Sequence, residues 1–157
     1  MADLRDYGEK VAEEYGITEP WELVVTEDEE EEGFYPPNRV VIFKEHPSLM
    51  KSQIRHELAH MKLHKDLLPG EPYSDVEDLI RREVEANLFA YGKASKLGLE
   101  YLMAYLVRDW GLSSREAKSS VVKVAKAMGV PTRTVSAAVR RFRKFPKGYL
   151  EEGRVEE

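Results

Sequence analysis

The sequence predicts an α+β protein. We expect a small antiparallel sheet packed on an N-terminal helix and on a helix that carries the letters HELAH, followed by an all-α C-terminal part. Two short runs rich in β-branched residues, WELVVT and RVVIF, are the expected strands. Apolar residues at helical spacing precede them, and after residue 48 the patterns are helical and separated by glycines and prolines.

Length and composition limit the kinds of protein that this chain can be. Its 157 residues suit one domain, or one domain with a small appended module, and an apolar fraction of 42% suits a folded core. The sequence contains no apolar run of 18 residues, and its first ten residues are mixed and acidic. We therefore expect neither a membrane span nor a signal peptide, and a cytoplasmic location. Without cysteine, a metal must bind to His, Asp or Glu.

The first 43 residues are expected to form one helix and two strands. Residues 3–15 have the helical spacing, and Gly16 follows as a stop signal. The strands are predicted at residues 21–26 and 39–43. The acidic run 27–32 between them is too charged to be buried and is expected to be an exposed loop. Because two prolines precede the second strand, an edge position suits that strand better than a central one.

The rest of the chain is expected to form five helices. Ser74 with Glu77, and Ser113 with Glu116, have the spacing of a capping box and mark two of the starts. The predicted helices cover residues 48–65, 74–96, 99–110, 114–128 and 132–144.

The stretch HELAH, residues 56–60, matches the pattern H-E-x-x-H on a predicted helix. His56 and His60 are four residues apart, so they lie on one helix face about 6 Å apart along the axis and can share one ion. Glu57 can reach a metal-bound water without being a ligand. Zinc lowers the pKa of such a water, and a carboxylate takes its proton during attack on a carbonyl. The pattern predicts one zinc ion per chain with Glu57 as the general base.

A catalytic zinc usually has a third protein ligand. His64 is four residues beyond His60, but it lies about 12 Å along the axis from His56, which is too far for both to bind one ion. The third ligand should therefore come from another element.

The following helix offers two glutamates, of which the helical projection favours Glu83. Glu83 and Asn87 fall within the apolar stripe of that helix, where a polar side chain is costly unless it has a partner. A zinc ion would be such a partner for Glu83, and a hydrogen bond to one of the zinc ligands would be such a partner for Asn87. Glu85 falls on the opposite side, next to Asp78 and Arg81.

HELAH followed by E-x-E-A-N-x-F-A, from Glu83 to Ala90, resembles the ImmA/IrrE family of gluzincin zinc metallopeptidases and the compact minigluzincins. The resemblance extends over about residues 38–90. It implies that Glu83 is the third zinc ligand and that Asn87 is the polar residue four positions later. After Ala90 the chain departs from the family pattern, because YGKASKLG stands where a Leu-rich stretch ending in Met-Pro is common.

On this basis we expect a gluzincin-type metallopeptidase core at residues 1–98 and a helical, helix-turn-helix-like region at residues 99–157. The expected activity is that of a zinc-dependent endopeptidase, with a peptide or protein as its substrate. The resemblance implies limited cleavage of a regulatory protein.

Residues 39–43 are expected to be either an edge strand to which a peptide substrate pairs or an ordinary core strand. His46, in a Glu-His-Pro turn, is expected to be structural or exposed. A group that stabilises the oxyanion would help catalysis, and the sequence leaves four candidates open, which are His64, Tyr73, Tyr91 and Tyr101.

The net charge of −5 is unevenly distributed. Residues 1–35 hold thirteen acidic and two basic residues, whereas residues 108–147 hold eleven basic and two acidic residues. Within the basic part, residues 124–144 resemble a helix-turn-helix, with Thr132 as the expected N-cap of the second helix. The alternative function is therefore a DNA-binding regulatory protein whose peptidase-like half is a structural or latent zinc scaffold.

Overall fold

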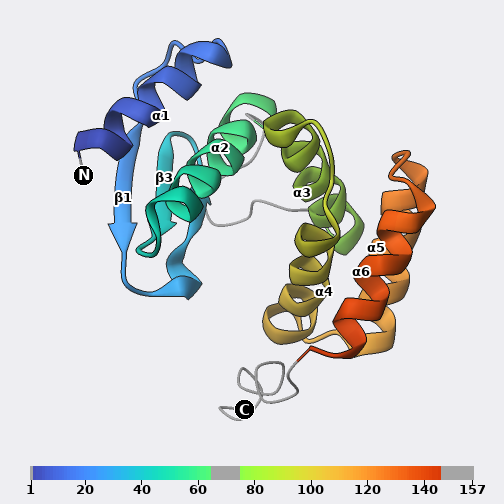
Figure 1. Ribbon diagram of the computed structural model, residues 1–157. Helices are drawn as coiled ribbons and strands as arrows, with labels where there is room; N and C mark the ends of the chain where they lie inside the picture. Colours follow the sequence, from blue (N-terminus) through green and yellow to red (C-terminus); the bar gives the residue numbers. More distant parts are fainter. Residues whose placement is uncertain (1, 65–74, 146–157) are drawn as a thin grey trace. The chain divides into compact units, whose positions relative to one another are not determined.

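The structure is a computed structural model and describes residues 2–64 and 75–145. The chain divides into two compact units, Met1–Ser74 and Asp75–Glu157. The first unit contains two helices and a three-stranded sheet, and the described part of the second contains helices (Figure 1). The expected α+β class is confirmed.

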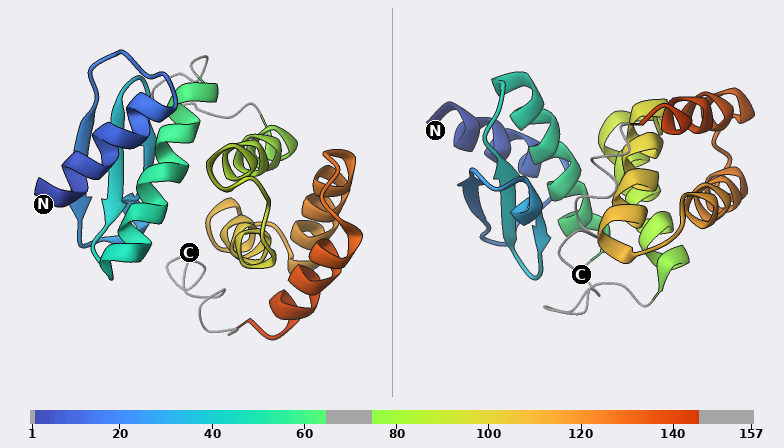
Figure 2. Two further views of the ribbon diagram at one scale, coloured as in Figure 1. Left: turned by 45° about the horizontal axis from the view of Figure 1, so that its top comes forward. Right: turned by 90° about the horizontal axis from the view of Figure 1, so that it is seen from below.

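In the first unit, both α-helices lie side by side on one face of the sheet (Figure 2). The apolar side chains that face this layer form its core, among them Val40, Ile42, Ile54 and Leu58, each 0% exposed. Its elements are α1 (Ala2–Glu14), β1 (Glu22–Thr26), the 3₁₀ turn η1 (Glu29–Glu31), β2 (Gly33–Tyr35), β3 (Arg39–Phe43) and α2 (Pro47–Leu63).

The sheet has the strand order β1-β3-β2, in which β3 pairs parallel with β1 and antiparallel with β2. The expectation of a wholly antiparallel sheet is therefore wrong. Part of the expected acidic loop forms η1, and β2 follows it. The extra strand reverses the chain once more, so that β3 runs parallel to β1. β3 is central and not an edge strand, because Pro36 and Pro37 occupy the turn before it and no proline stands in its ladder.

Two polar side chains fix the start of α2 relative to the sheet. The Gln53 amide bonds twice to the backbone of Phe43 at the end of β3, accepting from its N–H at 2.8 Å and donating to its carbonyl at 3.1 Å. His46 is the N-cap of α2, and its Nδ1 accepts from the Ser48 N–H at 3.2 Å. His46, which was expected to be structural or exposed, caps the helix and is exposed. α2 thus begins at a defined point beside the sheet.

α1 packs closely on the loop that leads to the sheet and on α2. Arg55 of α2 donates to the Tyr7 hydroxyl at 2.8 Å and pairs with Glu14 at 3.0 Å. Gly8 lies beneath the Trp21 indole, and a Cβ built on Gly8 would lie 2.6 Å from Cη2 of that ring. A side chain at position 8 would therefore push Trp21 out of its buried position.

The second unit contains α3 (Val76–Tyr91), α4 (Lys96–Trp110), α5 (Ser114–Ala127) and α6 (Thr132–Arg143). Asp75 caps α3, and the expected cap Ser74 lies outside the described residues. The predicted capping box of Ser113 and Glu116 is present at α5. Because α3 packs on α4 and α5, the compact units divide before α3. The functional division expected after residue 98 stays a prediction. No helix in the described ranges is long and apolar enough to span a membrane.

We predict that Gly8→Ala lowers the free energy of unfolding by about 1–3 kcal/mol, because a methyl group overpacks the contact with Trp21. This loss opposes the gain in helix propensity that alanine ordinarily brings. Urea unfolding measures the effect. Lys10→Ala, at an exposed position of the same helix, serves as the control and should change the stability by about 0.5 kcal/mol or less. A Gly8→Ala variant at least as stable as the wild type would show that the contact is not tight.

Candidate metal site

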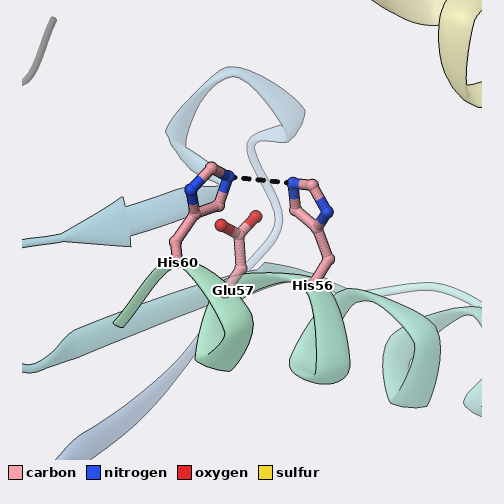
Figure 3. Close-up of side chains that lie close together, drawn as sticks. All are labelled: His56, Glu57 and His60. Carbon is pink, nitrogen blue, oxygen red and sulfur yellow. Dashed lines mark hydrogen bonds between the residues drawn. The ribbon is translucent and has the colours of Figure 1, made fainter. Parts of the chain in front are cut away.

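The HELAH residues lie in the last turns of α2, where the side chains of His56, Glu57 and His60 project from the helix and gather at one place (Figure 3). The Nε2 atoms of the two histidines are 3.1 Å apart, and the two rings stand almost perpendicular, at 87°. One possible ligand atom from each of the three side chains lies within 4.8 Å of the others.

This geometry suits a single metal ion. Two nitrogen ligands at about 2.0–2.1 Å from a tetrahedral zinc are about 3.3 Å from each other, close to the observed separation of the two Nε2 atoms. The group of His56, Glu57 and His60 can therefore bind a metal. Among the described residues, it is the group of His and acidic side chains whose possible ligand atoms lie close enough together to share one ion.

The three side chains differ in their access to solvent. His60 is 2% exposed and Glu57 is 9% exposed, whereas His56 is half-buried. An ion held between His56 and His60 would have one half-buried and one buried imidazole as ligands.

The opposite face of α2 sets the direction in which these side chains point. Ile54, Leu58 and Met61 lie on one face of α2 and are buried at 3% exposure or less. Since side chains on one helix are separated by fixed rotations, burying this face orients His56 and His60 together.

Tyr35 of β2 is a neighbour of the site that the sequence analysis missed. Burial raises the pKa of its hydroxyl, and the negative charges of Glu31 and Glu57 raise it further. The hydroxyl donates to the Glu31 carbonyl at 2.7 Å. The influence of Glu57 indicates that the short strand β2 runs close to the HELAH turn, on which β2 also packs. The one local signal for this strand was the pair of aromatic residues that follows Gly33.

Residues 39–43 were expected to be either an edge strand for a peptide or an ordinary core strand. β3 has β1 on one side and β2 on the other, so it is an ordinary central strand and the edge interpretation is wrong. Beside β3, the antiparallel edge of the sheet is β2.

Glu83 and Asn87 lie on α3 in the second unit, and both are half-buried. Asn87 faces α4, since a Cβ on Gly98 would lie 3.3 Å from its amide nitrogen. Glu85 pairs with Arg81, which also pairs with Asp78 at 2.8 Å, as the projection placed them. That Glu83 binds a metal stays a prediction.

Of the four expected oxyanion candidates, His64 is excluded by its position. It is 2% exposed and lies behind His60, with the two Nδ1 atoms 2.9 Å apart, so it cannot reach a substrate. Tyr91 ends α3 and Tyr101 lies on α4, where its ring contacts Phe145. Tyr73 lies outside the described residues.

A scan against models of protein families, a search of curated proteins and a search of solved structures found no match for this chain. The resemblance to the ImmA/IrrE family therefore stays a prediction.

We predict that the protein, freed of metal by a chelator, takes up one divalent metal ion per chain. His56→Ala and His60→Ala should each lower its affinity for Zn²⁺ by at least about 100-fold, because each removes a nitrogen ligand and losing only a hydrogen-bond partner of a ligand already costs about 10–100-fold. Competition with a chromophoric chelator measures this affinity. His46→Ala is the matched control, because it removes a histidine of the same helix that only caps its start. Equal affinities in all three variants would place the metal elsewhere.

Proposed function

We propose that this protein is a zinc-dependent endopeptidase. The observation that carries the proposal is the pair of Nε2 atoms 3.1 Å apart on one helix, with the carboxylate of Glu57 gathered beside them. Two histidines and an adjacent glutamate in H-E-x-x-H spacing are the parts that a zinc peptidase requires. The cysteine-free chain leaves nitrogen and oxygen ligands, which zinc accepts.

Glu83 is the proposed third ligand because of its position on α3. Glu85 lies on the opposite side of the helix, where Arg81 pairs with it and with Asp78. Glu83 lies on the side of α3 that also carries the buried Leu79 and Ile80. The family resemblance assigns the same residue.

When bound, zinc supplies a Lewis acid that polarises the scissile carbonyl and acidifies the attacking water. Glu57 accepts the proton of that water and later delivers it to the leaving amine, so one carboxylate acts first as base and then as acid. The Glu57 side chain is 9% exposed, so its carboxylate is largely shielded from bulk water. His56 and His60 hold the ion at the end of α2.

The substrate that we propose is an extended peptide segment lying along β2. An edge strand offers unpaired backbone groups that add a peptide as a further strand. β2 packs on α2, and its Tyr35 is within the electrostatic influence of Glu57. The resemblance to ImmA/IrrE proteins favours limited cleavage of a regulatory protein.

We predict that Glu57→Gln still binds one zinc ion per chain but cleaves peptides about 10²–10⁴-fold more slowly, because the amide cannot accept the proton of the attacking water. Metal analysis and a mixture of quenched fluorescent peptides provide the two measurements. Glu45→Gln, an exposed residue just before α2, is the matched control and should be as active as the wild type. The enzyme proposal fails if wild type and Glu57→Gln cleave equally fast, or if neither contains zinc.

A second candidate function, binding to duplex DNA, is favoured by the charge on α6. Val135, Ala138 and Phe142 bury one face of this helix, whereas the other face is basic and the helix contains no acidic residue. The exposed basic residues are Arg133, Arg140, Arg141, Arg143 and Lys144, of which Arg141 pairs with Glu100 at 2.7 Å.

α5 and α6 pack on each other and on α4, and Gly129 at φ +86° makes the turn between them. A turn of a few residues with a glycine is typical of helix-turn-helix units. The N-cap of α6 is Pro131 and not the expected Thr132, which begins the helix, and no side-chain cap is present. The exposed first turn of α6 is the part that enters the major groove in such units.

If α6 contacts phosphates, Arg133→Ala together with Arg140→Ala should weaken binding to a mixed-sequence DNA duplex. The slope of the logarithm of the binding constant against the logarithm of the salt concentration should also become shallower, by about 0.9 for each phosphate that the variant no longer neutralises. Fluorescence anisotropy at several salt concentrations gives both quantities. Lys10→Ala, which removes a basic residue from the first unit, should leave them unchanged. No measurable binding of the wild type at low salt removes this second candidate.

A further inference from the structure

His64, the residue after α2, contacts the innermost histidine of the candidate site from behind. His60 lies between two imidazoles, with its Nε2 facing His56 Nε2 at 3.1 Å and its Nδ1 facing His64 Nδ1 at 2.9 Å. The rings of His60 and His64 are 5.0 Å apart between centroids and inclined at 48°. Both residues are 2% exposed, so the contact lies inside the protein.

The end of the helix places His64 there. α2 ends at Leu63, and His64 is its C-cap, with φ −119° and ψ 50°. Its backbone N–H still donates to the His60 carbonyl at 2.8 Å. His64 is thus joined to His60 by a backbone bond and by a ring contact, and its departure from helical geometry brings its Nδ1 back towards the ring one turn earlier.

Two arrangements of protons satisfy the contact between the Nδ1 atoms when both rings are neutral. Either His60 Nδ1–H donates to His64, or His64 Nδ1–H donates to His60. A neutral imidazole carries one N–H, so only the first arrangement leaves His60 Nε2 without a proton and able to bind a metal. The second arrangement places the proton of His60 on Nε2, the atom that faces His56.

We propose that His64 is a positioning residue that holds His60 in the Nδ1–H tautomer and in the ring orientation required of a metal ligand. Metal-binding histidines usually donate their second N–H to a carboxylate, a carbonyl or water. Here the acceptor would be a second imidazole, that of His64, which orients the ring of His60. The role in metal binding rests on the proposed metal site, whereas the tautomer of His60 can be tested without a metal.

His64→Leu and His64→Asn form the test pair. Leucine removes the acceptor, while the Oδ1 of asparagine occupies nearly the position of Nδ1 and accepts the same hydrogen bond. Long-range ¹⁵N–¹H spectra of metal-free, ¹⁵N-histidine-labelled protein, recorded well above the ordinary imidazole pKa, report the tautomer of each ring. His60 should carry its proton on Nδ1 in the wild type and in His64→Asn, and on Nε2 to a substantial extent in His64→Leu.

The second measurement is affinity for Zn²⁺ by chelator competition. His64→Leu should bind zinc about 10–100-fold more weakly than the wild type, and His64→Asn should recover most of this loss. Val11→Ala, which shortens a side chain of α1 that is 1% exposed, controls for general destabilisation. An equal loss of affinity in Val11→Ala and His64→Leu would overturn the positioning role.

The measured tautomer of His60 distinguishes a failure of this proposal from a failure of the proposed function. If the wild type binds no zinc, the metal site fails but the spectrum of His60 still tests the contact. A wild-type His60 with its proton on Nε2 would overturn the proposal about His64 even if zinc binds, and so would equal zinc affinity in the wild type and in His64→Leu.

Discussion

The burial of one face of α2 is the constraint on which the candidate site depends. Ile54, Leu58 and Met61 fill the layer between the sheet, α1 and α2, and each is at most 3% exposed. Because the positions on a helix turn together, this burial fixes the side of α2 from which His56 and His60 project. The hydrogen bonds from Gln53 to the end of β3 then prevent the helix from sliding along the sheet. Packing therefore prepares the two nitrogens before any ion arrives.

Placing polar groups at this position has a cost that the site has to offset. A buried imidazole or carboxylate destabilises the fold unless it has partners, and Glu57, His60 and His64 are all at most 9% exposed. The row of three histidines gives each ring a partner, and an ion between His56 and His60 would replace their direct contact by two stronger bonds. Side chains held in this way lose little further freedom when they bind an ion or a substrate.

Much of the fold follows from patterns local to the sequence. The strand at residues 39–43, the helix that carries HELAH and the capping box of α5 depend on neighbouring residues, and all three were predicted. The strand β2 was missed because an acidic run before it indicates a loop, and its pairing with β3 is a contact that no local pattern encodes. The two prolines were misleading for a related reason, since they mark the turn before β3 and not the position of β3 in the sheet.

The histidines show the same division between local and distant information. Helical spacing predicted that the side chains of His56 and His60 lie close together. It also predicted that His64 lies too far from His56 for both to bind one ion. The same spacing makes His64 a neighbour of His60, a consequence that becomes visible only when the second ring nitrogen of His60 is considered. The proposed third ligand, Glu83, belongs to the second unit, so neither helical spacing nor packing within the first unit tests it.

The identity of that ligand is the most direct test of the zinc site. The zinc affinities of Glu83→Gln and Glu85→Gln, measured under identical conditions, compare two glutamates of one helix that differ in position and in partners. The account predicts a loss of more than about 100-fold for Glu83→Gln, because losing a ligand should cost more than the roughly 10–100-fold loss caused by removing a partner of a ligand. Glu85→Gln should lose only its ion pair with Arg81 and bind zinc as the wild type does. Equal affinities in the two variants, or a larger loss in Glu85→Gln, would contradict a zinc site made of His56, His60 and Glu83.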